Sequence, residues 1–508
     1  MQRKQLTLVI VSLLVVVLSV SLAWFTTQII GKGKNLNVSS ANLQIVFTDS
    51  DGALTGSNIE PGWSATKTFT IKNDTKTEYK YNIVIKDLLN TFVTNGYLQY
   101  KITSTNNGYN MTEFKDIPKS SAPKDTILAY SVVIPNGVTQ SYTIEFEYAN
   151  DESVDQSDDM GKKLSGTLFI TEGTEPPTLL SQILKDNPTR STRSNNNNGT
   201  NDFATPLTIT TTGTLFTSTE SITGITTSPK EVYYYAGNTT NNWVKFANRY
   251  WRIIRTNHDS SIRLLYVGTS HDTTDGNIGL SAFNTSHNSP KYVGYKYGED
   301  TSLDTIRNNT TDSTIKTFID SWYQNNLTNY TKYLSTSAVY CNDRSEGTGQ
   351  TYSVSADFNF ASYYRMDYDT KGATANPSYN CTDIRDAFSA ENTSAKLDYP
   401  ISLMTADEIA FAGGVANQTM NTPYAWFINN SAGSKVSIDW WSLSPSRWVN
   451  GGANVWYWYS GNANLSYIYV VITRAVRPAI SLKSCIKYST GDGTSESPYE
   501  IVETSSGC

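Results

Sequence analysis

The chain has 508 residues, a net charge of −6 and only 17% charged residues. Its length predicts two to four domains, and its acidic balance argues against a nucleic-acid partner, because phosphate binding needs a basic face. Hydrophobic content is low at 38%, but there are 33 tyrosines and 11 tryptophans, a composition typical of short strands and polar loops. A mainly β fold is therefore expected.

The N-terminus predicts export. A short positive segment at residues 2–4 precedes the almost wholly apolar run Leu6–Trp24, which is long enough to span a bilayer. Ser21–Ala23 is typical of a signal-peptide cleavage site. Residues 1–30 are therefore either a signal peptide cleaved after Ala23 or a retained membrane anchor, and in both cases the remainder lies outside the cytoplasm.

Residues 35–172 have the pattern of an all-β domain. Short apolar or alternating runs are separated by turn residues, as in a sandwich or jelly roll. A short helical or irregular insertion is expected at Lys86–Phe92. The predicted strands are Leu43–Phe47, Lys67–Lys72, Tyr79–Lys86, Leu98–Ile102, Leu128–Ile134, Ser141–Tyr148 and Leu164–Ile170.

The same region resembles the camelysin/TasA-type surface proteins over about residues 20–172. The resemblance is carried by Ala23–Thr26 (AWFT), Ile59–Gly62 (IEPG), Lys67–Asn73 (KTFTIKN), Asp155–Lys162 (DQSDDMGK) and Ser165–Leu168 (SGTL). It implies a jelly-roll-like sandwich exported from a Gram-positive-type bacterium. It also implies possible self-association through the β-sandwich into matrix fibres.

The acidic loop Asp151–Asp159 is the one place where a cofactor is conceivable. Its carboxylates could hold a structural Ca²⁺, but the loop lacks the spacing of an EF-hand, and a solvated loop is the preferred interpretation. No other metal or cofactor is expected.

Residues 173–230 are predicted to be a linker, partly disordered and rich in Asn, Thr and Ser. Leu179–Lys185 could form a short helix, while Asn195–Gly199 is polar enough for a flexible connection. Weak strand character follows at Thr208–Ser228.

Residues 231–508 are predicted to form an α+β domain. Its strands include a hairpin, Arg249–Arg255 with Ser261–Val267, in which Arg252 and Arg263 would lie on the polar face of a sheet. A helix is expected at Asp312–Asn325 from its apolar stripe. A second helix is expected at Met404–Ala412, where Thr405 and Glu408 form a capping box.

Four cysteines lie in this domain. Chain proximity favours the pairs Cys341–Cys381 and Cys485–Cys508, although four cysteines allow three pairings. An oxidising exterior favours disulfides, and without CxxC spacing a metal site is not expected.

The aromatic segment Trp440–Leu482 is the main candidate for recognition. Aromatic side chains with Asn, Ser and Gly between them are typical of a binding surface, and the alternative is an aromatic strand core. The candidate ligand-binding residues are Trp441, Trp448, Trp456, Tyr457, Trp458, Tyr459, Asn462, Asn464 and Tyr467.

Residues 231–490 carry a second resemblance. The blocks Trp440–Pro445 (WWSLSP) and Val476–Ala479 (VRPA) are similar to those of a family of bacterial surface domains of unassigned function. The resemblance implies a C-type-lectin-like fold, shared with formylglycine-generating enzymes. The redox-active cysteine pair of those enzymes has no counterpart near the VRPA block, and Arg477 is expected to be a structural anchor.

The sequence therefore predicts an adhesin-like cell-surface or secreted protein that binds a glycan or a protein. No catalytic motif is present, so an enzyme is not expected. The alternatives are a fibre-forming matrix subunit and an enzyme, either of the formylglycine-generating-like fold or a hydrolase.

Overall fold

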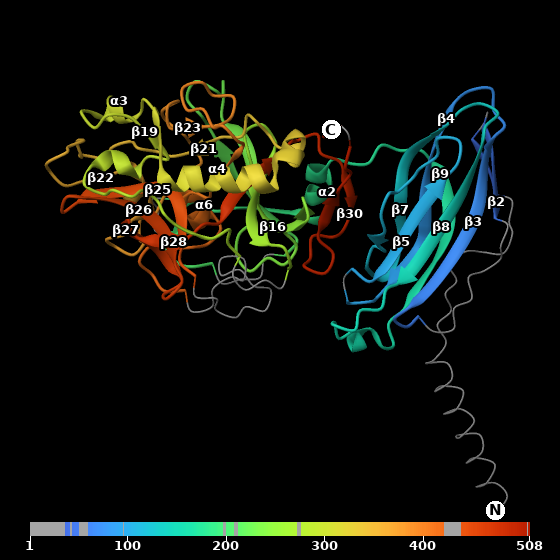
Figure 1. Ribbon diagram of the computed structural model, residues 1–508. Coiled ribbons are helices and arrows are strands. Elements are labelled where there is room, and N and C mark those ends of the chain that lie inside the picture. The colour runs from blue at the N-terminus through green and yellow to red at the C-terminus, as the bar shows by residue number, and fades with distance from the viewer. Residues whose placement is uncertain are drawn as a thin grey trace, which may run out of the picture. The chain divides into compact units, whose positions relative to one another are not determined.

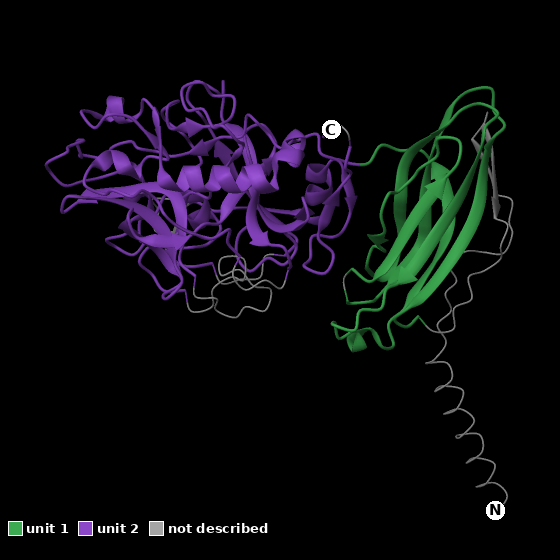
Figure 2. Cartoon of the chain, in the orientation of Figure 1, with its two compact units in different colours: residues 1–176 green, residues 177–508 purple. Residues whose placement is uncertain are grey.

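The computed structural model describes residues 36–40, 43–49, 59–94, 96–196, 200–207, 212–271, 276–420, 438–504 and 506–508. The predicted signal or anchor segment 1–30 lies outside these residues. Within the described ranges, no helix is both long and apolar enough to cross a membrane. The chain divides into two compact units, residues 1–176 and 177–508 (Figure 2).

The first unit contains two antiparallel sheets that share one core (Figure 1). The order of the larger sheet is β1 (Leu36–Ser40), β2 (Leu43–Asp49), β3 (Trp63–Asn73), β8 (Thr139–Tyr148), β5 (Leu98–Ser104), β6 (Lys115–Asp116). The order of the smaller sheet is β7 (Ser120–Ile134), β4 (Tyr79–Asn90), β9 (Leu164–Glu172). A 3-10 turn, η1, spans Ser157–Asp159.

Alternation of apolar and polar residues explains this sandwich. In β8 and β9 every second side chain is buried, so each strand gives one face to the core. The seven strands predicted from sequence are all present. No helix forms at Lys86–Phe92; β4 continues to Asn90 through an irregular stretch, a bulge where Asp87 has φ 53° and the register with β9 shifts.

The second unit is also mainly β. Its larger sheet has the path β10 (Thr189–Thr192), β13 (Thr214–Glu220), β14 (Lys230–Tyr234), β16 (Arg249–Thr256), β15 (Trp243–Phe246), β31 (Tyr499–Ile501), β30 (Tyr488–Thr490), with β17 (Ile262–Gly268), β29 (Pro478–Leu482) and β24 (Ile401–Leu403) attached through β16. The other large sheet has the path β18 (Leu280–Ala282), β28 (Thr473–Ala475), β25 (Trp440–Val449), β26 (Gly452–Tyr459), β27 (Asn464–Tyr469), with β22 (Phe358–Asn359) paired to β25.

Short elements complete this unit. The helices are α2 (Leu179–Asp186), α3 (Leu303–Ile306), α4 (Thr314–Asn326), α5 (Ala361–Met366) and α6 (Ala406–Phe411), with 3-10 turns η2 (Pro290–Val293) and η3 (Thr328–Tyr333). The two-stranded pairs are β11 (Asn195–Asn196) with β12 (Thr200–Asn201), β19 (Lys296–Tyr297) with β20 (Thr311–Asp312), and β21 (Tyr340–Cys341) with β23 (Ala387–Phe388). The helices predicted at α4 and α6 are present.

The predicted linker 173–230 is corrected by the structure. Its described part from residue 177 onward belongs to the second unit. Helix α2 buries Leu179 and Ile183 in the core, and β10 pairs in parallel with β13. A polar composition did not prevent this folding, because ladder hydrogen bonds are made by the backbone.

Candidate ligand-binding site

The aromatic segment forms β25, β26 and β27, and most of its rings lie in the core. Trp440, Trp441, Trp456 and Trp458 have no exposed area. Both faces of the sheet are covered, because Trp440 and Trp441 are adjacent on β25 and so point to opposite faces, yet both are buried. The indole of Trp456 donates to Ser362 Oγ of α5 at 3.0 Å, and that of Trp441 donates to the Ser281 carbonyl of β18, a strand of the same sheet, at 2.9 Å. These tryptophans therefore form an aromatic strand core, which was the alternative to a binding surface.

The nine predicted ligand-binding residues therefore separate into two groups. The buried group, which a ligand cannot contact in this structure, is Trp441, Trp448, Trp456, Tyr457, Trp458 and Asn464. Tyr459 and Tyr467 are half-buried, and Asn462 is exposed in the turn between β26 and β27.

Tyr467 belongs to a group of side chains that we call the tyrosine cluster, consisting of Tyr363, Tyr364, Tyr368, Asp369, Arg447 and Tyr467. The Tyr467 ring centroid lies 4.8 Å from that of Tyr368 and 5.9 Å from that of Tyr363. The buried ring of Trp456 packs against the cluster, with its centroid 6.0 Å from that of Tyr467. Tyr363 is buried, Tyr368 is half-buried and Tyr364 is 40% exposed.

Arg447 and Asp369 are the charged members of the tyrosine cluster. The Arg447 guanidinium lies over the rings of Tyr363 and Tyr467, at 4.9 and 5.3 Å from their centroids. Its Nη1 donates to both phenol oxygens, at 3.3 and 3.0 Å. The Tyr363 hydroxyl in turn donates to exposed Asp369 Oδ1 at 2.7 Å.

This arrangement keeps Tyr363 protonated. Burial raises the pKa of the phenol, and its hydrogen bond to Asp369 raises that pKa further. The hydroxyl is therefore a fixed link between a cation and a carboxylate.

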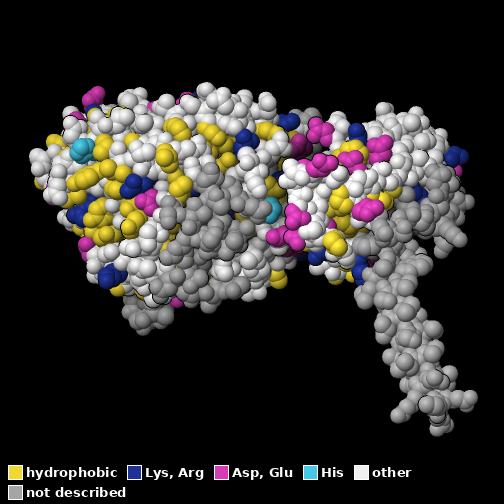
Figure 3. Space-filling view, turned by 60° about the horizontal axis from the view of Figure 1, so that its bottom comes forward, with side chains coloured by type: hydrophobic (Ala, Val, Ile, Leu, Met, Phe, Trp, Pro, Cys, Tyr) yellow, Lys and Arg dark blue, Asp and Glu magenta, His cyan; other side chains and the backbone are white. Residues whose placement is uncertain are grey.

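The tyrosine cluster could not be located from the aromatic segment alone. Four of its members, Tyr363, Tyr364, Tyr368 and Asp369, come from α5 and the residues after it, about eighty positions before β25 in the chain. The density of tyrosine in YYRMDYD was the available signal. On the face shown in Figure 3, hydrophobic side chains of the second unit gather with Lys and Arg among them.

A second polar site is built around Glu408. Its carboxylate accepts from Arg255 Nε at 2.8 Å and from Arg263 Nη1 at 2.6 Å. Arg255 also contacts Glu220 at 2.9 Å. Arg252 and Arg263, which the alternation placed on a polar sheet face, are both buried. That face is covered rather than solvated.

The charged side chains that line a small pocket beside this site are Glu220, Arg255, Arg263, Asp343, Arg365 and Asp407. Its empty volume is about 330 Å³, part of which is open to solvent. Arg365 bridges the two aspartates, at 2.6 Å from Asp343 and 2.8 Å from Asp407. Because the charged groups of this pocket pair with one another, we interpret them as a network that stabilises the fold.

The structure predicts an acid dependence of stability at Glu220. Burial alone raises the pKa of Glu220, but Arg255 and His258 outweigh burial and hold that pKa at about 2. A lowered folded-state pKa stabilises the fold above the unfolded-state value near 4.5, and the contribution is lost as the pH falls toward 2. Thermal unfolding of the wild type and of Glu220→Gln, measured from pH 7 to pH 2, should converge with acid. Parallel curves would contradict this assignment.

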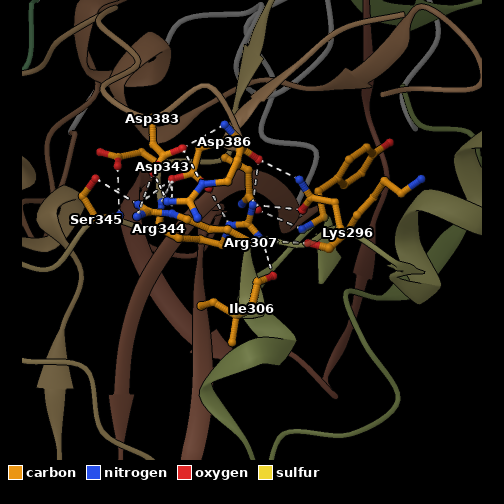
Figure 4. Close-up of polar contacts among 12 residues, drawn as sticks. Lys296, Ile306, Arg307, Asp343, Arg344, Ser345, Asp383 and Asp386 are labelled. Carbon is orange, nitrogen blue, oxygen red and sulfur yellow. Dashed lines mark hydrogen bonds and ion pairs between the residues drawn. The ribbon is translucent and has the colours of Figure 1, made fainter. Parts of the chain in front are cut away.

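A third network fixes three loops around Arg344 and Asp386 (Figure 4). Both side chains are fully buried, and their Nε–Oδ1 distance is 2.7 Å. Arg307 reaches Asp386 at 2.8 Å and Asp383 at 3.1 Å. Arg344 also donates to the carbonyl oxygens of Lys296 and Ile306. This network therefore organises the loops of the unit.

The candidate metal ligands are already satisfied by a lysine. Within the described ranges, the one group of three that could hold an ion is Asp312, Asp320 and Asp398. Lys316 Nζ lies 3.0, 2.5 and 2.6 Å from their respective oxygens. Burial lowers the pKa of Lys316, but these carboxylates outweigh it and raise the pKa overall, so an ammonium takes the place of a metal ion.

The loop considered for Ca²⁺ uses its carboxylates in local hydrogen bonds. Asp151 accepts from Ser153, while Asp159 accepts from the Val93 amide and the Tyr148 hydroxyl. Asp155 accepts from the Ser157 amide. The described residues of this loop do not form a three-ligand group.

The structural assignments made from sequence are present. Thr405 and Glu408 form the capping box of α6. Arg477 is buried and donates to the Tyr266 carbonyl at 3.2 Å, with its guanidinium 5.1 Å from the Trp440 ring centroid. Burial lowers the pKa of Arg477 to about 9. The two disulfides are Cys341–Cys381 and Cys485–Cys508.

Comparison of the chain with protein-family models, with curated proteins and with solved structures found no match.

Proposed function

We propose that this is an adhesin-like, cell-surface or secreted binding protein whose second unit binds its ligand through the tyrosine cluster. The observation that carries the proposal is the partly exposed group of Tyr364, Tyr368 and Tyr467 beside Arg447 and Asp369. A fixed aromatic surface with a few polar groups is the usual composition of a recognition site. Binding, not catalysis, is the proposed activity.

The two disulfides support an oxidising location. We place the protein outside a Gram-positive-type cell, either secreted or attached through residues 1–30. In this proposal the first unit is a TasA-like, jelly-roll-like stalk, and the second has a C-type-lectin-like fold. A glycan is favoured over a protein ligand, because the tyrosine cluster offers hydroxyl and charged groups beside its rings and not a continuous apolar groove.

The test is a glycan array probed with the full chain, produced under oxidising conditions. A fragment beginning at residue 231 is unsuitable, because it would lack α2, β10 and β13. Replacing Tyr368 and Tyr467 together by alanine should weaken binding at least tenfold, since each loses aromatic contact area. The matched control is Tyr399→Ala, a half-buried tyrosine of the same unit that stacks on Tyr323 at 4.8 Å. Equal losses in both variants would contradict the site.

A fibre-forming matrix subunit is the second candidate. Strand β9 pairs only with β4 among the described strands, and its sequence LSGTLFITE contains no proline or lysine. Such a regular edge is suited to pairing with another chain. Filaments in electron micrographs of a chain that binds no glycan would favour this candidate. An enzyme, oxidase or hydrolase, is the third, and a reaction found in a substrate screen would favour it.

A further inference from the structure

Among the described residues, Arg447 has no carboxylate partner, unlike Arg344, Arg365 and Arg474. Arg344 and Arg365 each contact a carboxylate within 2.8 Å, and Arg474 reaches Asp439 at 3.2 Å. Among the described residues, the hydrogen-bond acceptors of Arg447 are the phenol oxygens of Tyr363 and Tyr467.

The guanidinium therefore keeps donors for a ligand. Both of its hydrogen bonds to described residues come from Nη1. Nε is buried without a hydrogen-bond partner in the described structure. Nη2 makes no hydrogen bond to a described residue, and a guanidinium N–H forms a strong, charge-assisted hydrogen bond with a carboxylate. The Tyr467 hydroxyl accepts from Arg447, so its proton is available to the same acceptor.

The rest of the tyrosine cluster offers acceptors and ring faces. Asp369 is exposed and accepts a hydrogen bond from the Tyr363 hydroxyl through Oδ1, which leaves Oδ2 for hydroxyl groups of a ligand. Tyr364 and Tyr368 add partly exposed rings. Arg447 and Asp369 together carry no net charge, so the tyrosine cluster suits a ligand with one acidic group and several hydroxyls. A polyacidic peptide would bring several carboxylates, which Asp369 repels, and no hydroxyl groups to donate hydrogen bonds to Asp369.

We propose that the tyrosine cluster binds an acidic glycan, with Arg447 and Tyr467 holding the carboxylate of a sugar acid. Asp369 accepts hydrogen bonds from the sugar hydroxyls, and Tyr368 packs against the sugar ring. This inference rests on the proposed function and adds the chemical class of the ligand. A hydrogen bond to a charged group contributes about 1.5–3 kcal/mol, which corresponds to roughly 10- to 150-fold in affinity.

The experiment compares each acidic sugar with its own neutral form. Oligosaccharides ending in galacturonic, glucuronic or sialic acid are arrayed beside their carboxyl methyl esters and beside polyglutamate, and the full chain is applied. The acid should bind at least tenfold more tightly than its ester. Arg447→Met, which keeps an unbranched stem but removes the guanidinium, should remove that difference. Arg447→Lys should keep it only in part, because lysine has the charge but not the planar guanidinium that lies over the rings of Tyr363 and Tyr467.

The matched control is Arg474→Met, because Arg474 also lies over a tyrosine ring, 5.3 Å from that of Tyr457, but already has Asp439 as its partner. It should keep the preference for the acid. Equal binding of acid and ester, both lost in the Tyr368/Tyr467 double variant, would overturn the acidic class and leave the proposed function standing. Binding of polyglutamate alone would overturn the glycan. Binding of none of the probes would overturn the acidic class, and the proposed function would then depend on the neutral sugars of the glycan array.

Discussion

Replacing Asp386 by alanine is expected to lower the free energy of unfolding of the second unit by about 3–5 kcal/mol, as when one partner of a buried ion pair is removed. Asp386 is fully buried and accepts from the Arg344 amide, from Arg344 Nε and from two nitrogens of Arg307. Its loss leaves the buried Arg344 charge without a counter-charge. Urea unfolding monitored by tryptophan fluorescence measures this change in the free energy of unfolding.

A matched control is Asp304→Ala. Asp304 is also paired with an arginine, Arg385, at 3.0 Å, but its side chain is 80% exposed. Exposed pairs contribute about 0–1 kcal/mol, so this variant should be close to the wild type. Asp386→Asn keeps the side-chain shape and part of the hydrogen bonding, and it should fall between them. Equal effects at Asp386 and Asp304 would contradict the role of burial.

Replacing Trp458 by alanine is expected to destabilise the second unit by about 3–5 kcal/mol, the usual cost of truncating a large buried aromatic side chain. The Trp458 ring is fully buried, stacks with Trp440 at 6.4 Å and lies against Gly414. The loss should appear as a lower urea midpoint. Ligand binding would then fall together with folding, so this variant cannot locate a binding site.

The matched control for Trp458 is Tyr364→Ala. Tyr364 is 40% exposed and contacts Tyr363 at its edge, with ring centroids 6.0 Å apart. It should cost about 1 kcal/mol or less, as surface substitutions usually do. A Trp458→Ala protein with an unchanged midpoint would place this tryptophan outside the cooperative core.

Local features were predicted well because their causes are local. The strands of the first unit follow from alternation within each run, and the start of α6 follows from the reciprocal bonds of Thr405 and Glu408. The disulfide pairing favoured by chain proximity is the one observed. These predictions needed only neighbours in the chain.

The recognition residues were predicted only in part. Tyr467 was identified, whereas Arg447, Tyr363 and Asp369 were not, because α5 and β25 meet only after folding. Trp456 was predicted to contact a ligand, although the composition of the aromatic segment is the same whether α5 covers that face of the sheet or leaves it open. The indole bond to Ser362 shows which case holds.

The amino-acid sequence by itself determined a mainly β protein with two disulfides, an apolar N-terminal segment and an aromatic C-terminal sheet, because periodicity, capping and composition act over short stretches of chain. The tertiary structure decided the rest. It assigned residues from 177 onward to the second unit, buried the tryptophans and collected Arg447 with the tyrosines. Parallel pairing of β10 with β13, and coverage of the β25–β27 sheet by α5, join segments far apart in the chain, and no local pattern encodes such contacts.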